Sequence, residues 1–420
     1  MTEVIKIEGG HRLEGEVVIS GAKNATVALI PAAVLANSAV TIAGIPQIAD
    51  VDSLTEILNI LHVDVKETVN GHLVIDPSNM ENTVLDQDVV TKLRASYYFM
   101  GALLGKYGRV CMKMPGGCYL GPRPIDLHLK GFEALGAKVS NMGDLYTIEA
   151  EKLIGTKIFL DIASVGATIN IMMAAVYAEG RTTIENAAKE PEIIDVATLL
   201  NNMGARIRGA GTNVIKIDGV RSLSGCVHEI IPDRIEAGTF IIIAAAMARH
   251  MVVRGIIPQH LDALLSKLTD MGINMNVGID FVEISETKHM NAVNITTKPY
   301  PGFATDLQQP LTTLLTQAEG VSRIKETIYI ERFKHCDELN KMGASIDWQE
   351  GSCHVNGPTP LHGAKVVATD LRCGAAMVVA GLVAQGITEI SNVYHIDRGY
   401  SEIDRKLREL GAVIWREQIE

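Results

Sequence analysis

The chain is poor in aromatic residues and has no apolar run long enough to cross a membrane. Only 5% of its 420 residues are Phe, Trp or Tyr although 47% are hydrophobic, so its cores must be built from aliphatic side chains. The longest apolar run, Phe240 to Ala248, is far shorter than the roughly 20 residues that span a bilayer. The start, Met1 to Lys6, has no signal-peptide character. We expect a cytoplasmic protein of two or three domains without membrane contact.

Cysteines are also few, and acidic residues outnumber basic ones. The net charge of −11 argues against a nucleic-acid binder held by phosphate contacts, and no G-x-x-x-x-G-K-[ST] phosphate loop occurs. Six cysteines without regular spacing are typical of reduced thiols in a cytoplasm. The pairs His335-Cys336 and Cys353-His354 raise the alternative of zinc. No C-x-x-C occurs, however, and adjacent residues of a strand point to opposite faces, so we predict no metal.

What the chain does have is an internal repeat. A helix-ending motif, apolar-x-x-Leu/Met-Gly, recurs at near-equal spacing, and Leu61-His62-Val63 is a degraded first copy of it. The glycines of the five clear copies are Gly136, Gly204, Gly272, Gly343 and Gly411. Glycine is expected there because the residue that closes a helix often takes a left-handed conformation.

A second marker alternates with the first: an alanine-rich helix ends and a short strand follows. These helices are predicted to end at Asn37, Gly108, Gly180, His250, Gly320 and Gly386. After each second helix come two short β-runs joined by a turn, such as 138–140 and 146–149. The pattern predicts a β-α-β-α-β-β unit used six times. Six units exceed one core, so we predict two domains of three units each.

The alanine-rich helices are apolar on most faces, as in Ala167 to Tyr177 and Gly238 to Ala248. Such helices must be buried, so they are expected to lie inside, with the sheets outside them. The predicted fold class is therefore α/β: a two-domain inside-out α/β barrel with buried helices and outer sheets.

Polar residues gather where these buried helices are predicted to begin. The residues one helix length before each end marker are Lys23, Arg94, Gly166, Glu236, Asp306 and Arg372. Helix N-termini bind anions, whereas a cation there opposes the helix dipole and asks for another explanation. The second helices add Arg123, Arg332 and Arg398 near their starts. Arginine pairs bidentately with phosphate and carboxylate, so the pattern predicts a multiply anionic ligand in a shared cleft, with Asp306 available as a base.

Two structural explanations compete with this interpretation. Asp233, Asp306 and Asp370 could be ordinary acidic N-caps. The cations could simply pair with nearby aspartates, and for Arg398 the neighbours Asp397 and Asp404 are available.

A loop around Cys118 is the strongest single feature. Gly116-Gly117 precede the thiol and Gly121-Pro122-Arg123-Pro124 follow it, and residues of these types break helices and strands. A cation near a cysteine lowers its pKa and raises its reactivity. The alternative is a surface loop with an incidental cysteine, but the glycines and the arginine favour a catalytic thiol.

Together these runs resemble the UDP-N-acetylglucosamine 1-carboxyvinyltransferases, a family of enolpyruvyl transferases. The resemblance covers the whole chain and rests on Ser20–Asn24, Leu93–Ser96, Pro115–Cys118, Gly121–Pro124, Ser164–Thr168, Asn186–Glu192, Pro232–Glu236, Thr305–Gln308, Ala368–Arg372 and Tyr394–Tyr400. The sibling family of enolpyruvylshikimate phosphate synthases shares the fold and phosphoenolpyruvate but lacks the Gly-Gly-Cys loop.

The resemblance implies a reaction and a domain division. The enolpyruvyl group of phosphoenolpyruvate would move to the 3-hydroxyl of UDP-N-acetylglucosamine through a tetrahedral ketal, with release of phosphate, in the first committed step of peptidoglycan synthesis. No metal or organic cofactor would take part, and no protein partner is implied. Residues 22–229 would form the first domain, and residues 1–21 plus 230–420 the second.

The resemblance also implies residue roles. Lys23, Arg123 and Arg398 would bind phosphate, Arg332 and Arg372 the carboxylate; Asp306 would be the base and Cys118 the proton donor. The remaining expected substrate contacts are Asn24, Arg94, Pro124, Ile125, Asp126, Leu127, Ser164, Val165, Gly166, Ile328, Asp370 and Leu371. Some members carry a basic residue where this chain has Ile162. A non-catalytic paralogue that binds the sugar nucleotide is the alternative, and loss of Cys118 or Asp306 would be its signature; both are present.

Overall fold

The computed structural model describes residues 2–114 and 125–419, so Cys118, Arg123 and Pro124 lie outside the described residues. The chain divides into two compact units. Unit 1 comprises Met1–Ser20 and Pro232–Glu420, and unit 2 comprises Gly21–Ile231. Each unit has its own hydrophobic core, and the two cores share no residue.

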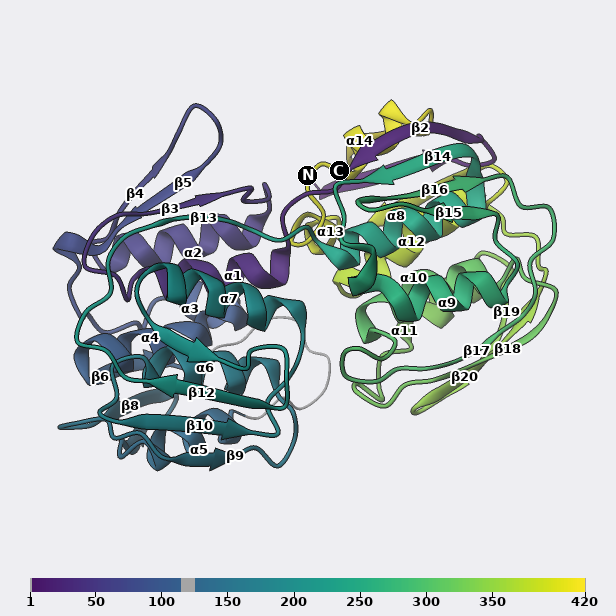
Figure 1. Cartoon of the computed structure of the whole chain (residues 1–420). Helices are drawn as coiled ribbons and strands as arrows, with labels where there is room; N and C mark the ends of the chain where they lie inside the picture. The colour runs from purple at the N-terminus through teal and green to yellow at the C-terminus, as the bar shows by residue number, and fades with distance from the viewer. Residues whose placement is uncertain (1, 115–124, 420) are drawn as a thin grey trace. The chain divides into compact units, whose positions relative to one another are not determined.

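The described part of unit 2 contains three sheets (Figure 1). Their strand orders are β13-β3-β5-β4, β6-β8-β7 and β11-β12-β10-β9. The strands are β3 Val40–Ala43, β4 Asp64–Glu67, β5 Leu73–Asp76, β6 Arg109–Lys113, β7 Lys138–Met142, β8 Leu145–Glu149, β9 Lys157–Phe159, β10 Arg181–Glu185, β11 Arg206–Arg208, β12 Val214–Asp218 and β13 Val227–Glu229.

The described part of unit 1 contains three sheets as well, with orders β15-β16-β14-β2, β17-β18-β20-β19 and β21-β22-β1-β23. The strands are β1 Thr2–Glu8, β2 Leu13–Val18, β14 Ala248–Arg254, β15 Met275–Val277, β16 Phe281–Ser285, β17 Asn294–Thr296, β18 Gly320–Lys325, β19 Ser345–Gln349, β20 Ser352–Gly357, β21 Lys365–Val367, β22 Ile387–Ser391 and β23 Val413–Ile419.

Two helices accompany nearly every sheet, and short 3₁₀ turns link some of them. In unit 2 the helices are α1 Lys23–Ala33, α2 Ala49–Ile60, α3 Asp88–Lys92, α4 Tyr98–Tyr107, α5 Asp126–Ala134, α6 Val165–Ala175 and α7 Pro191–Asn202, with 3₁₀ turns η1 Pro77–Asn79 and η2 Arg94–Tyr97. In unit 1 they are α8 Arg234–Met247, α9 Asp262–Asp270, α10 Thr305–Leu315, α11 Lys334–Lys341, α12 Leu371–Val383, α13 Tyr394–Asp397 and α14 Ile403–Glu409, with η3 Pro258–Leu261. No helix in the described ranges has the length and apolar character needed to cross a membrane.

The predicted repeat is confirmed, and one copy shows it completely. Strands and helices follow in the order β9, α6, β10, α7, β11, β12. Strand β9 runs parallel to β10, while β12 runs antiparallel to both β10 and β11. Other copies are completed by distant segments: β13 lies beside β3, β2 beside β14, and β1 between β22 and β23. The first strands of the chain therefore belong to sheets of unit 1.

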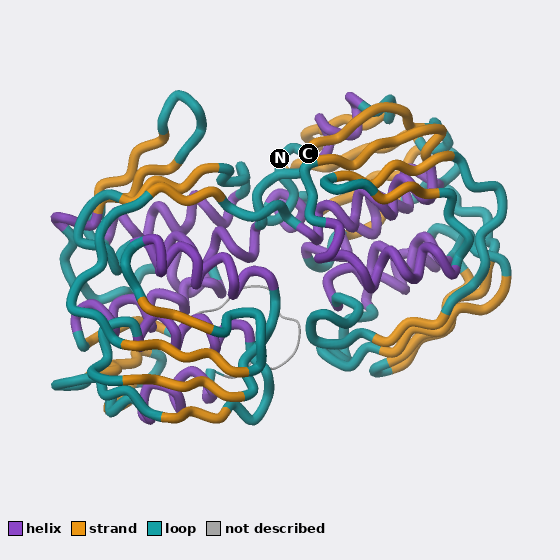
Figure 2. Tube along the Cα trace, in the orientation of Figure 1, coloured by secondary structure: helices purple, strands orange, loops and turns teal. Residues whose placement is uncertain are grey.

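Within each unit the apolar helices lie inside and the strands lie outside them (Figure 2). Every residue of α6 from Gly166 to Ala175 is buried. Helix α4 approaches α6 closely because Gly101 has no side chain; a Cβ there would lie 2.3 Å from the carbonyl oxygen of Asn170. The inside-out arrangement expected from helices without a polar face is confirmed.

The helix-ending glycines behave as their sequence motif indicates. The five clear copies have φ values from 82° at Gly272 to 110° at Gly204. His62 takes the same left-handed region, with φ 56°, in the degraded first copy. Because this conformation costs most residues free energy, glycine occupies it in the other five.

Three helix boundaries were predicted wrongly. Helix α10 ends at Leu315, and Gly320, its predicted end, is the first residue of strand β18. Helix α8 ends at Met247, and His250 lies inside strand β14. The pairing of β14 with β2 and β16 outweighs the helix propensity of Ala248. The second helix of the last repeat is split into α13 and α14, with Glu402 in a left-handed conformation between them.

Candidate active site

An ion-pair cluster around Asp306 is the chemical centre of unit 1. Asp306 is the second residue of α10. Its Oδ1 accepts a hydrogen bond from Arg332 at 2.7 Å, and its Oδ2 accepts one from Arg372 at 2.9 Å. Arg332 lies just before α11, and Arg372 is the second residue of α12. The resemblance implied one shared role for Arg332 and Arg372 and another for Asp306, and the structure brings the three residues together.

The charges in this cluster are only partly open to solvent. The side chains of Arg332 and Arg372 are each 3% exposed, whereas that of Asp306 is 24% exposed. Burial alone would raise the pKa of Asp306, but the charges of Arg372 and Arg332 outweigh it and hold that pKa well below its ordinary value. Asp306 is therefore ionised at neutral pH and, in this arrangement, a weak base.

The capping explanation is right for two of the three aspartates. Asp233 accepts hydrogen bonds from Ile235 N and Glu236 N at the start of α8. Asp370 likewise accepts bonds from the backbone N–H groups of the second and third residues of α12, and Leu371 is the first residue of that helix. For Asp306 the capping explanation is wrong, because it lies inside α10, after its N-cap residue, and both its oxygens bind arginines.

Arg398 lies at the end of α13, not at the start of α14, and is 9% exposed. Its guanidinium carbon lies 5.9 Å from the ring centre of Tyr394. The two aspartates that the sequence offered as its partners also bind other arginines. Both oxygens of Asp397 accept bonds from Arg416, at 2.7 and 3.0 Å, and Asp404 pairs with Arg416 as well as with a second arginine.

In unit 2, Lys23 and Asn24 open α1 and reach neighbouring helices. Lys23 Nζ lies 2.9 Å from the carboxylate of Asp50 on α2, and this pair is largely buried. Asn24 Nδ2 donates to Glu192 on α7 at 3.4 Å. The pairing of Lys23 with an aspartate, the structural alternative, does occur. The sequence did not single out Asp50, since an acid in the first turn of a helix is usually explained by the helix dipole.

The starts of α5 and α6 and the turn η2 meet within unit 2. Ser164 caps α6 by accepting a bond from Ala167 N at 3.2 Å, and Val165 and Gly166 follow as its first residues. A Cβ on Gly166 would lie 2.8 Å from the Tyr97 hydroxyl and 3.0 Å from His128 Cε1. Three other residues with predicted substrate contacts, Ile125, Asp126 and Leu127, form the start of α5. Glycine is thus required where these elements approach.

His128 is a neighbour of this group that the sequence did not single out. Asn170 accepts from Gly101 N through its Oδ1, so its Nδ2 donates to His128 Nδ1 at 2.8 Å. The ring proton is then on Nε2. Burial, with a further contribution from the charge of Arg94, lowers the pKa of His128 to about 3, so the ring is neutral. The sequence signal that could have identified His128 is its position directly after Leu127, a residue with a predicted substrate contact.

A cavity of about 690 Å³ lies in unit 1, against β17, β18 and β20. Asp306, Arg332 and Arg372 are not among its lining residues, although Glu326 and Ile330 are. We therefore place the candidate active site at the ion-pair cluster, because of its chemistry, and not at this cavity. In the described ranges no group of three or more His, Cys, Asp or Glu side chains is arranged to hold a metal. His335 and Cys336 lie on helix α11 and not on a strand, so the strand argument applies only to Cys353-His354.

Comparison with known structures defines the class of fold. An enolpyruvyl transferase, NikO from Streptomyces tendae, matches all of both chains with a TM-score of 0.90 at 28% identity. EPSP synthase from Acinetobacter baumannii matches 99% of this chain and 100% of its own with a TM-score of 0.77 at 17% identity, which supports the fold alone. The fold is that of the enolpyruvyl transferases.

Sequence comparison then gives the family. The family model described as EPSP synthase (3-phosphoshikimate 1-carboxyvinyltransferase) matches residues 7–407, and the chain belongs to this family. It is 56% identical over 418 residues to UDP-N-acetylglucosamine 1-carboxyvinyltransferase 2 of Bacillus subtilis (strain 168). It is 58% identical over 419 residues to the protein of that name from Geobacillus kaustophilus (strain HTA426). Both matches cover 99% of this chain and 97% of the relative.

Proposed function

We propose that the chain transfers the enolpyruvyl group of phosphoenolpyruvate to the 3-hydroxyl of UDP-N-acetylglucosamine and releases phosphate. Relatives with this name match nearly the whole chain at 56% and 58% identity. The observation that carries the proposal is the carboxylate of Asp306 held between Arg332 and Arg372. These groups are a base and a carboxylate-binding pair, which the reaction needs. The cytoplasm, where the nucleotide sugar would be used, is the proposed compartment.

The two arginines explain how the base is controlled. A planar guanidinium binds carboxylates well, and Asp306 now takes the place that the carboxylate of phosphoenolpyruvate would take. A substrate carboxylate that competes for Arg332 and Arg372 weakens their hold on Asp306. The pKa of Asp306 then rises, because its burial opposes ionisation. Asp306 thus becomes a competent base for the sugar hydroxyl when phosphoenolpyruvate is bound.

The remaining roles are those that the family resemblance implies. Lys23 and Arg398, with Arg123, bind the phosphate that leaves; Asn24 and Arg94 contact substrate near the reacting carbon. The N-terminus of α6 at Ser164, Val165 and Gly166 suits the diphosphate, because helix N-termini offer free N–H groups. The start of α5 and Ile328 adjoin the nucleotide. The first domain comprises residues 22–229, and the second comprises residues 1–21 together with residues 230–420.

The steps use these groups in order. Cys118 donates a proton to the methylene carbon, which leaves positive character on the neighbouring carbon. The sugar hydroxyl, losing its proton to Asp306, attacks that carbon and forms a tetrahedral ketal. Phosphate then departs and the methyl group returns a proton to the Cys118 thiolate, which restores the vinyl ether. Fixed cations stabilise the charge that develops on the leaving phosphate.

A phosphate-release assay with UDP-N-acetylglucosamine and phosphoenolpyruvate tests the proposal. Release that depends on both substrates is the expected result. Shikimate 3-phosphate replaces the sugar nucleotide in the control and should give no release. Release with shikimate 3-phosphate instead contradicts the substrate assignment, and binding of the sugar nucleotide without turnover favours the non-catalytic alternative.

Arg398→Ala should lower kcat/KM for phosphoenolpyruvate, because the arginine contacts the leaving phosphate. The loss of transition-state stabilisation should be about 2–4 kcal/mol. Arg398→Lys should recover part of this loss, since an ammonium lacks the planar fork of a guanidinium. Binding of UDP-N-acetylglucosamine should change much less. Steady-state kinetics of the purified variants measure all three effects.

Arg405→Ala is a matched control for this variant. Arg405 lies in the same unit but on the exposed surface of α14, where it pairs with Glu402 and Glu409. Its loss should leave kcat/KM unchanged. A near wild-type kcat/KM in the Arg398→Ala variant rules out the phosphate role.

A further inference from the structure

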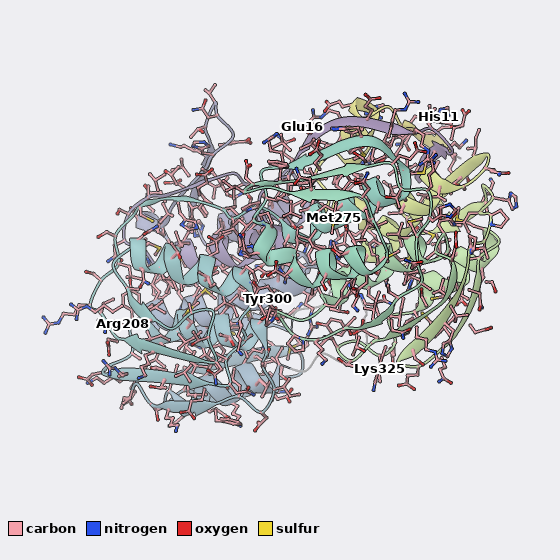
Figure 3. The ribbon with its side chains drawn as sticks, turned by 45° about the vertical axis from the view of Figure 1, so that its right-hand side comes forward. His11, Glu16, Arg208, Met275, Tyr300 and Lys325 are labelled. Atoms are coloured by element: carbon pink, nitrogen blue, oxygen red, sulfur yellow. The ribbon has the colours of Figure 1, made fainter. Side chains whose placement is uncertain are left out.

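Glu326 is a buried acid beside the Asp306 cluster that the roles above leave unused. It follows β18 directly and is 2% exposed, whereas the preceding Lys325 lies on the outer side of the unit (Figure 3). Side chains of an extended segment alternate between its two faces, so the side chain of Glu326 points inward as those of Ser322 and Ile324 do. A buried carboxylate is stable only when hydrogen-bond donors satisfy its oxygens.

The two oxygens of Glu326 have different partners. Oε1 accepts from Thr297 Oγ1 at 2.7 Å and from the backbone N–H groups of Ile328 and Tyr329 at 2.8 and 3.1 Å. Oε2 accepts from Thr305 Oγ1 at 2.9 Å. The first oxygen thus holds the turn that carries Ile328, and the second reaches the residue next to Asp306.

The hydroxyl of Thr305 links Glu326 to the cluster. Its one proton is donated to Glu326, so the lone pairs of its oxygen face Arg332, which donates to it at 3.1 Å. The same nitrogen of Arg332 donates to Asp306 at 2.7 Å. A continuous chain of hydrogen bonds therefore runs from Glu326 through Thr305 to the guanidinium of Arg332.

We infer that Glu326 is a positioning residue for substrate carboxylate binding: it fixes the direction of the Thr305 hydroxyl and thereby the orientation of Arg332. This inference rests on the proposed function, in which Arg332 holds the carboxylate of phosphoenolpyruvate. Through its other oxygen Glu326 also holds the turn at Ile328, a proposed nucleotide contact. Because each oxygen has a separate task, substitutions can separate them.

Glu326→Gln keeps one task and disturbs the other. The amide oxygen can still accept from Thr297 and from the two backbone N–H groups. The amide nitrogen then faces Thr305 Oγ1 as a donor, so two donors converge on that oxygen and its own proton loses its acceptor. The KM for phosphoenolpyruvate should rise on the order of tenfold, while kcat and the KM for UDP-N-acetylglucosamine stay within about twofold, since Arg332 binds ground state and transition state alike.

Changes at Thr305 test the link directly. Thr305→Val removes the hydroxyl and should raise the KM for phosphoenolpyruvate as Glu326→Gln does. Thr305→Ser keeps the hydroxyl, so its KM for phosphoenolpyruvate should stay near the wild-type value. Glu326→Ala removes both oxygens and should raise the KM for both substrates. A purely structural role of Glu326 predicts equal effects of the serine and valine variants.

Glu338→Gln is the matched control. Glu338 is also a buried acid of unit 1, and it accepts from Val367 N at 3.0 Å and from Lys341 at 2.6 Å. This variant should lower the melting temperature without changing the KM for phosphoenolpyruvate. An unchanged KM in Glu326→Gln, or an equal rise for both substrates, overturns the inference.

A binding measurement separates this test from that of the proposed function. Absence of phosphate release by the wild-type protein contradicts the function itself. The shift in melting temperature caused by phosphoenolpyruvate needs no turnover, and it should be smaller in Glu326→Gln than in the wild type. An equal shift in both proteins overturns the role of Glu326 whatever the turnover assay gives.

Discussion

Replacing Asp306 with asparagine should lower kcat by about 10²- to 10⁴-fold, the usual contribution of a general base. Asparagine keeps the shape of the side chain but cannot accept the proton of the sugar hydroxyl. It also leaves Arg332 and Arg372 without their shared counter-charge. The arginines are then free to bind the substrate carboxylate, so the KM for phosphoenolpyruvate should not rise. Initial rates at saturating and limiting phosphoenolpyruvate separate the two effects.

Asp270→Asn is the control for this variant. Asp270 lies at the end of α9, where it is exposed and pairs only with Lys267 among the described residues. Its replacement should leave kcat unchanged. A kcat of Asp306→Asn within about tenfold of the wild type contradicts the role of Asp306 as base.

The same ion pairs make a prediction about stability and pH. The pKa of Asp306 is lower in the folded protein than in the unfolded chain, where it is about 3.9. Asp306 therefore stabilises the fold above the unfolded pKa, and this stabilisation is lost as the pH falls toward the folded pKa. Removing the charge from a buried pair costs about 3–5 kcal/mol, so Asp306→Asn should melt lower at pH 7. The difference should shrink at acidic pH; a constant difference in melting temperature contradicts the prediction.

Most of the fold could be predicted from the sequence because short-range patterns mark the helices and turns of each repeat. The residue that ends a helix often has a left-handed conformation, which favours glycine, so the five glycines marked the helix ends. Only the first copy, which has His62 at this position, was hard to recognise. Helices without a polar face, such as α6, could only be buried. Where long-range pairing decided the structure, the prediction was wrong: His250 joins β14 because β2 and β16 lie on either side of it.

The candidate site shows a similar limit. The positions of Lys23, Asp306 and Arg372 at helix starts could be predicted from spacing, and all three lie there. Their partners could not, because Asp50 and Arg332 come from other elements and local patterns do not record such contacts. Glu326 gave no signal at all, since its importance lies in hydrogen bonds that only the folded chain creates. Whether each residue contacts substrate stays a prediction.

The cysteines of the described residues provide the background for the last prediction. Five thiols are free there, and three of them, Cys336, Cys353 and Cys373, are buried. Burial raises the pKa of Cys226, raises that of Cys336 strongly, and raises that of Cys373 to about 12. A thiol with a raised pKa carries little thiolate and reacts slowly with alkylating agents. Cys118, which the sequence places between two glycines and an arginine, is expected to differ from them.

Cys118→Ala should lower kcat by about 10²- to 10⁴-fold, because the methylene carbon loses its proton donor. It should also abolish inactivation by thiol-alkylating phosphonates such as fosfomycin. Cys118→Asp should keep part of the turnover and resist the inhibitor, since a carboxylic acid can donate a proton but is a poorer nucleophile. Cys226→Ala, which removes a half-buried thiol of the described residues, should behave as the wild type in both assays. Full activity of Cys118→Ala contradicts the assignment of the catalytic thiol, and continued inactivation of that variant places the reactive cysteine elsewhere in the chain.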